Sequence, residues 1–528
     1  MHRVLLICLF SFSWASVFTQ DVELESSDIP IFIVTTNGEE IPNEPKINVH
    51  LGIIDNGDSR NYITDPFNGY DGKVGIEIRG NGTADLDKVS YLFETREEDG
   101  SNNNVDLLGL PKENDWILYA PWIDKTLIRN ILTYDLANRM GMYSSRTRFV
   151  ELIIDDEYIG VFVLLEKIKR DKNRVAVTKF DEENNDPSSG GYIVRIDSWF
   201  HHTKGWTSDT YQVDGNDRAV NFQYVYPKYD NITDAQKEYV SSFVHDFEHT
   251  LNDAQPPFIS EAIKDKIDIN SFIDFFIIQE LSKNPDGYRL STYFSREAGG
   301  KITMGPMWDH NYCYGNYNPY ENVFIKWEYD NSWWQFNDAQ IPFWWDKLMQ
   351  DSFYVSTLNE RWSALRNNGT INCDAFSTRI DEWAAEVYEA QGRNFVRWPV
   401  LGVNSTFDWN AGPTYEDELE YLKNWLCNRI EWLDYQLPEM ERKFDLKDFE
   451  VHPNPADFEC TVEFFAPEEG IYTLHIYDIQ GRLVLSKQFS LIEGYNQMTF
   501  EIAELSSGIY LLQFPNLESY PIKKLVVR

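Results

Sequence analysis

The spacing of hydrophobic and polar residues changes several times along the chain, and each change marks a predicted element. Val74, Ile76 and Ile78 occupy alternate positions, which is typical of a half-buried strand. A Gly-Asn-Gly turn and a second apolar run follow, so the pattern predicts a strand, a turn and a second strand over residues 73–95. Residues 29–72 are predicted to form short strands and turns.

A helix and a hairpin come next. Apolar residues recur every three or four positions over residues 124–140, which predicts an amphipathic helix. Asp124 is a natural N-cap for this helix, and Gly141 stands where a C′ glycine ends one. Strand patterns on both sides of an Asp-Asp turn then predict a β-hairpin over residues 149–165.

The second half of the chain divides into a helical part and a strand part. A helix is predicted over residues 270–281, followed by a hairpin that turns at Gly299 and Gly300. Residues 341–441 keep helical spacing for most of their length. From residue 452 onward short strands alternate with turns, which predicts a small all-β sandwich.

The N-terminus has the pattern of an export signal. Residues 1–20 combine Arg3, an apolar run and the small residues Ala15 and Ser16, which predicts a secretory signal peptide too short to remain as a membrane span. No other stretch has a long enough uninterrupted apolar run, so the mature chain is not expected to be transmembrane.

Composition describes a folded, strongly acidic protein. The hydrophobic fraction of 42% and the charged fraction of 25% are those of a globular chain. The net charge of −38 argues against binding nucleic acid or anionic membranes through a basic surface. This charge favours solubility, or attraction of divalent cations. The aromatic fraction of 15% is ascribed first to core packing, and second to stacking on sugars or bases.

The cysteines do not suggest a framework. Cys313, Cys373, Cys427 and Cys460 remain after the predicted signal peptide and are widely scattered, so neither a disulfide scaffold nor a zinc motif is expected. Cys313 is expected to be a buried free thiol.

Two aspartates at the ends of the predicted second hairpin carry the candidate chemistry. A short hairpin out and back would return Asp309 close to Asp286. One carboxylate could then accept a hydroxyl proton while the other holds Mg²⁺ against phosphate oxygens, which are the two roles that phosphoryl transfer needs. Taken alone, aspartates at hairpin ends are more often turn formers.

The first half supplies residues suited to binding a nucleotide. Gly80 and Asn81 lie in a glycine-rich turn, and Lys88 follows on the next predicted strand, where an ammonium can bridge phosphate oxygens. Glu166 stands at the end of the predicted first hairpin. In kinases the segment that follows this hairpin is the hinge, which holds adenine. The ordinary alternatives are a surface lysine and a strand-end carboxylate.

The chain resembles the CotH family, the spore-coat-H-like proteins, over roughly residues 29–440. The segments that carry the resemblance are GIEIRGNGT with KVSY, DWILYAPWIDKTLIRNILTYDLA, EYIGVFVLLEKIKRDKNRV, GGYIVRID, NPDGYRLSTYFSRE, GKITMGPMWDHNYCYGN and PFWWDKLMQDSFY. The resemblance implies an α+β fold: a two-lobed atypical protein-kinase-like domain over residues 29–445. It also implies ATP and Mg²⁺ or Mn²⁺ as cofactors, and transfer of phosphate to protein hydroxyl groups.

The resemblance also assigns roles to residues. Asp286 matches the catalytic aspartate and Asp309 the metal-binding aspartate. The matches on the nucleotide side are Lys88 for the phosphates, Glu166 near the adenine, and Gly80 and Asn81 in the turn that covers the nucleotide. Arg129 and Asn130 match a frequent family pair whose role the sequence does not indicate.

Two departures bear on activity. Ordinary kinases place an asparagine five residues after the catalytic aspartate as a second metal ligand, and here Ser291 stands there. His310 and Asn311 follow Asp309 in place of Phe-Gly, and Asn311 could supply a second oxygen ligand. These changes leave open either catalysis with one metal or nucleotide binding without transfer.

The C-terminal segment has its own resemblance. Residues 449–528 contain VHPNPA, IYDIQGRLVLS, SSGIYLLQF and KKLVV, and are similar to the C-terminal sorting domain of type IX secretion in Bacteroidetes-like bacteria. With the signal peptide, this implies passage across both membranes with the help of the type IX machinery. The expected location is the cell surface or the medium.

Two functions from different classes therefore compete. The first is an extracellular protein kinase, which the two aspartates favour although ATP is scarce outside cells. The second is a catalytically weak or inactive surface protein with a kinase shape that binds or adheres, for instance to carbohydrate. A glycoside hydrolase is a distant third, because it gives no role to the hairpin between the acids.

Overall fold

The computed structural model describes most of the chain. The described residues are 21–80, 86–180, 186–198, 204–210, 219–256, 258–317, 325–329, 339–404, 411–445, 449–466, 469–492, 494–515, 517 and 520–528. The predicted signal peptide, residues 1–20, lies outside this part of the chain. None of the helices described is both long and apolar enough to cross a membrane.

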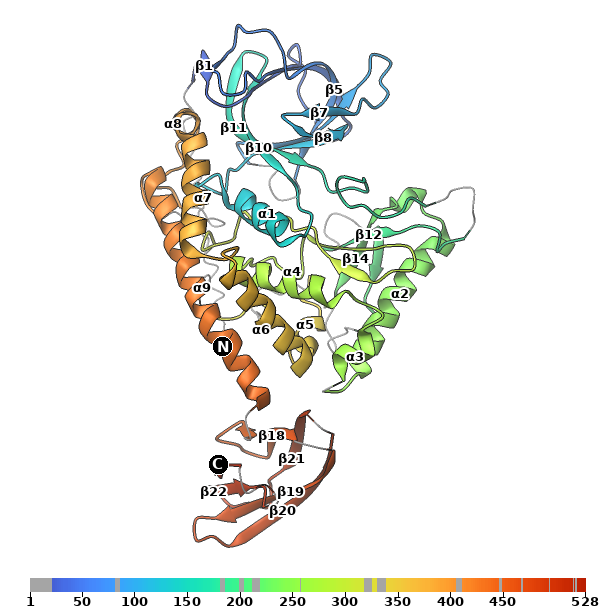
Figure 1. The fold of residues 1–528 in the computed structure, drawn as a ribbon, viewed down its shortest axis with the longest axis vertical. Helices are drawn as coiled ribbons and strands as arrows, with labels where there is room; N and C mark the ends of the chain where they lie inside the picture. Colours follow the sequence, from blue (N-terminus) through green and yellow to red (C-terminus); the bar gives the residue numbers. More distant parts are fainter. Residues whose placement is uncertain are drawn as a thin grey trace, which may run out of the picture.

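Seven N-terminal strands close into a barrel, at the top of Figure 1. In barrel order they are β10 (Thr147–Ile154), β11 (Glu157–Glu166), β9 (Asp115–Tyr119), β6 (Ser90–Arg96), β5 (Tyr70–Arg79), β3 (Ile47–Ile54) and β2 (Ile31–Thr35). The barrel closes because β10 pairs antiparallel with β11 and parallel with β2. Two small sheets accompany it, β1 (Ser26–Ser27) with β4 (Asn61–Tyr62), and β7 (Val105–Leu107) with β8 (Leu110–Glu113).

The alternating pattern explains the barrel interior. Val74 and Ile76 on β5 pack with Phe93, Trp116 and Phe162 in one apolar cluster. The predicted strand pair over residues 73–95 and the predicted hairpin over residues 149–165 are both confirmed. The closure into a barrel was not foreseen, since β2 meets β10 across more than a hundred residues of sequence.

Helix α1 (Arg129–Met140) begins later than predicted. Asp124 is not its N-cap, since Ile128 occupies that position without a side-chain cap. Asp124 instead turns the chain ahead of the helix, accepting hydrogen bonds from the backbone N–H groups of Thr126 and Arg129. The predicted end of the helix is confirmed, because Gly141 takes the left-handed conformation at φ 94°.

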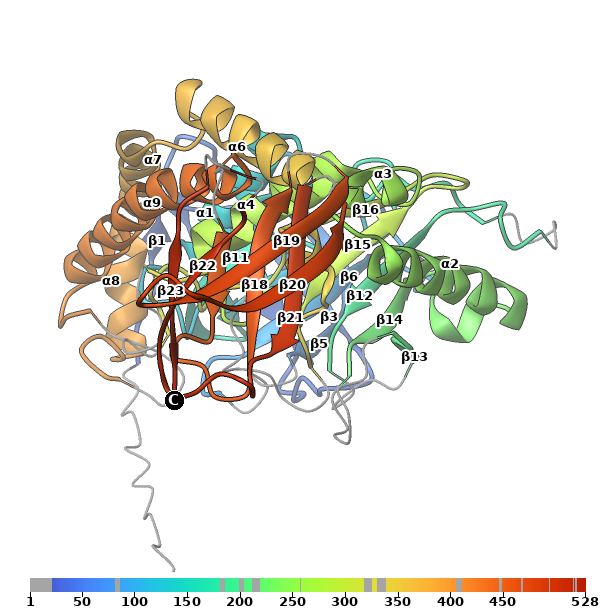
Figure 2. The ribbon, with the colours of Figure 1, turned by 90° about the horizontal axis from the view of Figure 1, so that it is seen from below.

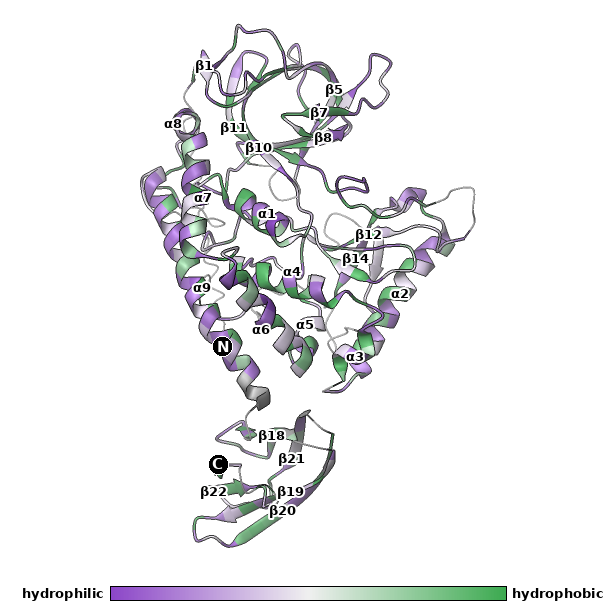
Figure 3. Ribbon diagram, in the orientation of Figure 1, coloured by the Kyte–Doolittle hydropathy of each residue, from purple (hydrophilic) through white to green (hydrophobic). Residues whose placement is uncertain are grey.

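A mixed α/β layer lies below the barrel. Its five-stranded sheet has the order β13 (Gly205–Thr207), β14 (Asn221–Tyr226), β12 (Tyr192–Ile196), β15 (Thr292–Arg296) and β16 (Ile302–Met304). The helices around it are η1 (Tyr229–Asn231), α2 (Asp234–Asp253), α3 (Ile259–Ile263) and α4 (Ile269–Ser282). Helix α4 is buried along most of its length and is largely green in Figure 3, whereas α2 alternates hydrophobic and hydrophilic residues.

The remaining helices flank this layer and reach the barrel. They are α5 (Trp344–Leu348), α6 (Ser352–Asn367), α7 (Cys373–Glu386), α8 (Tyr388–Arg397) and α9 (Tyr415–Asp445). Helix α8 packs against β11 of the barrel. We refer to all these helices with the five-stranded sheet as the helical region.

The cysteine prediction was wrong for one pair. Cys373 on α7 and Cys427 on α9 form a disulfide, with Cα atoms 5.3 Å apart. Cys313 is a buried free thiol, as expected, and Cys460 is a second one. A cross-link within the helical region is consistent with an oxidising compartment.

The C-terminal region is all β, and Figure 2 looks onto it along the long axis of the molecule. One sheet contains β17 (Phe449–His452), β18 (Glu459–Ala466) and β21 (Gly494–Glu501), and the other contains β20 (Leu483–Leu491), β19 (Gly470–Asp478), β22 (Gly508–Gln513) and β23 (Lys523–Val527). Side chains of both sheets share one apolar cluster in which Phe464 contacts Tyr472 and Phe514. The predicted sandwich of short strands therefore forms a separate core.

Candidate active site

A cavity of about 770 Å³ lies between the barrel and the helical region, and we call it the interface cavity. Its volume is within the range of small-molecule sites. Its barrel side includes Arg79, Gly80, Lys88 and Leu92, and its helical side includes Arg195, Asp197, Asp286, Ser291, Asp309 and Asn311. Aromatic side chains complete the lining: Tyr119, Trp122, Tyr134, Trp308 and Tyr312.

The hairpin of β15 and β16 brings the two predicted aspartates to this cavity. The strands pair antiparallel with Phe294 opposite Met304, so the segments before β15 and after β16 run side by side. Ser291 Oγ lies 3.5 Å from Asp309 Oδ2, which joins the two segments directly. The carboxyl groups of Asp286 and Asp309 also interact electrostatically.

Unusual backbone conformations concentrate in these two segments. Tyr288, Ser291 and Asp309 have φ of 66°, 48° and 59°, in the left-handed region that side chains other than glycine rarely adopt. Such conformations persist where the surrounding structure enforces them, and they cluster at functional sites.

Buried side chains hold the Asp286 segment. The Tyr288 hydroxyl donates to Glu280 Oε1 at 2.9 Å, and Glu280 forms a buried ion pair with Arg429 at 3.0 Å. Arg289 donates to Asp286 Oδ1 at 2.9 Å and to the carbonyl of Pro285. The position of Asp286 is thus fixed by contacts beneath it.

Helix α1 holds the Asp309 segment and gives roles to the family pair. The Asn130 side chain accepts from the His310 N–H at 2.7 Å, and Arg129 Nε donates to the carbonyl of Cys313 at 3.0 Å. Tyr134 accepts from the Asp309 N–H through its hydroxyl at 3.1 Å, and its ring stacks on Trp308. Arg129 and Asn130 therefore position the loop that carries Asp309.

Loss of water and the charges of neighbouring carboxylates raise the pKa of both aspartates. The pKa of Asp309 is raised to about 6, first by burial and then by the charges of Asp286 and Asp197, while Arg79 opposes the shift. The pKa of Asp286 is raised by burial, while Arg289 lowers it and Asp197 raises it. Three carboxylates facing one cavity favour the presence of a cation.

The donor atoms suit magnesium rather than a transition metal. Asp309, Asn311 and Ser291 offer carboxylate, amide and hydroxyl oxygens, which Mg²⁺ prefers. Among the described residues, no group of three or more His, Cys, Asp or Glu side chains is placed to hold a metal by itself. A magnesium ion here would need oxygens from a bound phosphate, as is usual for nucleotide sites.

Lys88 lines the interface cavity, but its ammonium has protein partners. Its Nζ donates to the carbonyl of Val161 at 2.5 Å and to Asn394 Oδ1 at 2.8 Å, and it lies 4.7 Å from the centre of the Phe162 ring. The side chain is almost fully buried, and burial lowers its pKa well below the usual value.

Glu166 lies outside the interface cavity. Its buried carboxylate pairs with Arg146 at 2.7 Å and lies 3.7 Å from Arg174. The Tyr143 hydroxyl and the Arg146 N–H also reach it. The carboxylate thus pairs with arginines of neighbouring segments, and its role beside adenine stays a prediction.

The glycine-rich turn is only partly described. Gly80 lines the cavity with a φ of 129°, a conformation that favours glycine. Asn81 lies outside the described residues. The barrel nevertheless presents the start of this turn to the same cavity as the two aspartates.

Several cavity residues were missed by sequence reasoning. Arg79 ends β5 directly before the glycine-rich turn, and Arg195 and Asp197 stand at the end of β12. A signal existed for Asp197, because it closes the segment GGYIVRID, which carries part of the family resemblance. The same signal existed for Arg79, because it lies in the segment GIEIRGNGT, which also carries the resemblance.

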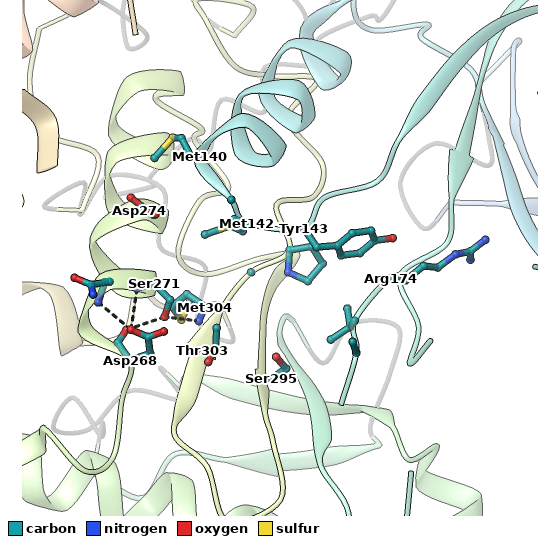
Figure 4. Close-up of a pocket in the computed structure, with 16 residues that line it drawn as sticks. Met140, Met142, Tyr143, Arg174, Asp268, Ser271, Asp274, Ser295, Thr303 and Met304 are labelled. Carbon is teal, nitrogen blue, oxygen red and sulfur yellow. Dashed lines mark hydrogen bonds between the residues drawn. The ribbon is translucent and has the colours of Figure 1, made fainter. Parts of the chain in front are cut away.

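A second cavity has a volume of about 330 Å³. The same hairpin contributes Ser295 and Thr303 to its lining (Figure 4). Met140, Met142 and Met304 line it with residues at the start of α4. Asp268 there caps α4, accepting hydrogen bonds from the Asn270 and Ser271 N–H groups. A second acid that lines it, Asp274, is paired with Arg361 at 2.7 Å. Because both acids are already engaged, this cavity suits phosphate chemistry less well.

Comparison with known families matches both parts of the chain. A family model described as CotH kinase protein matches residues 76–433. A second, described as a secretion system C-terminal sorting domain, matches residues 450–528. No curated protein matches the chain. The first match includes every residue that lines the interface cavity apart from Asn43 and Glu44.

Proposed function

The chain belongs to the CotH family, and from this premise we propose that it is a secreted or cell-surface protein kinase that transfers the γ-phosphate of ATP to hydroxyl groups of extracellular proteins. The barrel and the helical region would act as the two lobes of an atypical kinase-like fold. The observation that carries the proposal is the convergence of Asp286 and Asp309 on one nucleotide-sized cavity.

Asp286 has the position of a general base. Arg289 engages its Oδ1, and about a third of the side chain is exposed, so Oδ2 can accept the proton of a substrate hydroxyl. The hydroxyl oxygen would form a bond to the γ-phosphorus as the bond to the β-phosphate oxygen breaks, with ADP as the leaving group. Burial raises the pKa of Asp286, which makes its carboxylate a stronger base.

Asp309, Asn311 and Ser291 are the residues that would hold Mg²⁺ or Mn²⁺. The ion supplies charge neutralisation for the phosphate oxygens when bound. The chain's own contribution is placement, since α1 fixes the Asp309 loop through Asn130 and Tyr134. Gly80 and Asn81 would cover the nucleotide from the barrel side. The partners found for Lys88 and Glu166 leave both outside the proposed machinery.

The C-terminal sorting domain indicates export through type IX secretion to the cell surface or the medium. We propose that residues 1–20 direct the first step across the inner membrane. Substrates would then be extracellular or surface proteins. The exported enzyme would have to bind ATP outside the cytoplasm. The proposal therefore requires a local source of the nucleotide.

The test is phosphate transfer by the purified mature chain. With Mg²⁺ or Mn²⁺ and γ-labelled ATP, the wild type should label itself or an added acidic or basic protein, and Asp286→Asn should not. Asp156→Asn, in the exposed turn between β10 and β11, is the matched control and should label like the wild type. Equal labelling of wild type and Asp286→Asn would refute the proposal.

Two observations favour a second candidate, an inactive kinase-shaped binding protein. Ser291 replaces the expected second metal ligand, and the ammonium of Lys88 is already bound by protein groups. Adhesion to carbohydrate through exposed tryptophans has less support, since each described tryptophan is buried or half-buried. Retained nucleotide binding with no transfer to any protein would favour this second candidate.

A further inference from the structure

We propose that Arg79, rather than Lys88, is the cation that binds the phosphates of the nucleotide, and that Lys88 instead fastens α8 to the barrel. This inference rests on the proposed nucleotide site. It concerns which residue carries the phosphate contact, so it can fail while the site itself stands.

Lys88 is fully engaged away from the phosphate position. Its ammonium bridges the carbonyl of Val161 on β11 and the side-chain oxygen of Asn394 on α8, at 2.5 and 2.8 Å. Asn394 Oδ1 also accepts from the Val161 N–H at 3.1 Å, so the three residues form a closed joint. Moving the ammonium to a phosphate would take its hydrogen bond from the buried carbonyl of Val161 and break the joint to α8, which is costly.

The joint belongs to a larger contact between α8 and the barrel. Arg393 pairs with Glu151 at 2.6 Å. Trp398 Nε1 donates to the carbonyl of Ile159 at 2.7 Å. Lys88 is therefore one of several polar contacts that fix the barrel against the helical region, and this gives it a structural reason to be buried.

Arg79 has the opposite character. It stands at the end of β5, beside Gly80, and lines the interface cavity. Within the described part of the chain its guanidinium has no hydrogen bond or ion pair, and it lies 5.1 Å from the centre of the Trp308 ring. Its charge interacts with Asp309, which lines the same cavity.

This placement suits a phosphate. A guanidinium offers parallel N–H donors that match phosphate oxygens, and a ring beneath it holds its plane without using those donors. Because Trp308 precedes Asp309 directly, the ring also sets Arg79 close to the proposed metal ligand. A phosphate between Arg79 and a metal on Asp309 would be neutralised from both sides.

The other cavity arginine is less suited to the role. Arg195 already pairs with Asp197 at 3.0 Å and donates to Gln223. A phosphate would have to compete with these partners. The guanidinium of Arg79 would gain its hydrogen bonds on binding without losing others.

The test separates affinity for phosphate from affinity for the nucleoside. Calorimetry would measure dissociation constants of MgATP and adenosine for the mature chain and its variants. Arg79→Met should weaken MgATP by about 10- to 100-fold and leave adenosine within about twofold, because charged hydrogen bonds are lost only with the phosphates. Arg79→Lys should recover part of this, and Arg96→Met, on the neighbouring strand β6, is the matched control.

Lys88→Met should leave the ratio of the two dissociation constants within about threefold and lower the thermal midpoint. If this variant does not fold, Asn394→Ala tests the same joint with the lysine retained, and should give the same pattern. The inference would be overturned if Arg79→Met bound MgATP as tightly as the wild type. It would also be overturned if Lys88→Met or Asn394→Ala lost the preference for MgATP over adenosine. The nucleotide site itself would stand in either case. A wild type that does not bind MgATP would overturn both.

Discussion

The cores of the barrel and of the helical region differ in composition. The barrel cluster consists of apolar side chains from alternating strand positions, such as Ile76 and Phe162. The buried carboxylates of the barrel, such as Glu151, pair with residues outside its strands. The core of the helical region contains an ion pair between two of its own helices, Arg429 on α9 with Glu280 on α4. This pair lies beneath the loop that carries Asp286, because Tyr288 in that loop donates a hydrogen bond to Glu280.

The difference shows which segments around the cavity need specific side-chain contacts to hold their conformation. An apolar barrel can present a strand end and a turn by its register alone. Loops with positive φ need specific partners, and the hydrogen bond from Tyr288 to Glu280 supplies one such partner. The helical region thus gives up some stability to hold two acids in place. The following variants test this contrast, from the largest expected effect to the smallest.

The largest effect is expected from substituting each of the two aspartates in turn. Asp286→Asn and Asp309→Asn should each lower phosphate transfer by about 10³-fold. Only Asp309→Asn should abolish the dependence of nucleotide binding on Mg²⁺, because only Asp309 is proposed as a metal ligand. Calorimetry with and without Mg²⁺ checks this. Identical binding by both variants would contradict the division of roles.

Breaking a buried ion pair should come next. Arg429→Met leaves Glu280 buried without its cation, which costs about 3–5 kcal/mol. Hydrogen exchange should show α4 and the Asp286 segment losing protection while the barrel strands keep theirs. Arg96→Met, which removes a partly exposed ion pair of the barrel, should cost no more than about 1 kcal/mol. Equal loss of protection in both regions would argue against the contrast.

Glu248 predicts a dependence on pH. Burial raises its pKa from 4.5 to about 7, although Ser208 and Trp344 donate hydrogen bonds to it. The folded state therefore keeps a proton that the unfolded chain releases, and its stabilising effect is present below pH 4.5 and lost as pH rises through 7. The loss is at most about 3 kcal/mol.

Glu248→Gln removes this titration. The variant should match the wild type near pH 5 and be the more stable of the two near pH 8, as measured by unfolding midpoints across this range. Parallel pH profiles for the two proteins would show that Glu248 does not titrate in this way.

The smallest effect is expected inside the barrel. Ile76→Val removes one buried methylene and should cost about 0.5–1.5 kcal/mol. Phosphate transfer should stay within about twofold of the wild type, since no loop of the cavity depends on this side chain. A large loss of transfer would mean that barrel packing controls the geometry of the site.

Local patterns allowed much of the fold to be predicted from the sequence. The C′ glycine at residue 141, the Asp-Asp turn before β11 and the hairpin at Gly299 each depend on residues within a few positions of one another. Because a short hairpin brings its two ends together, the sequence also predicted that Asp286 and Asp309 lie close to each other. The structure brings both to one cavity.

Features set by long-range packing could not be predicted. Lys88 lies just before β6 and meets Asn394 across 306 positions of sequence, so its local sequence gave no sign that its ammonium would be engaged. The disulfide joins Cys373 to Cys427 across 54 positions, and only the packing of α7 on α9 brings them together. Glu166 matched a hinge position by order along the chain, but Arg146 captures its side chain.

The most direct test of the account is a crystal structure of the mature chain with Mg²⁺ and a non-hydrolysable ATP analogue. The account predicts that the triphosphate lies in the interface cavity, with the metal on Asp309, the γ-phosphate facing Asp286, and Arg79 on the phosphate oxygens. Density for the triphosphate outside this cavity, or no metal at Asp309, would contradict it.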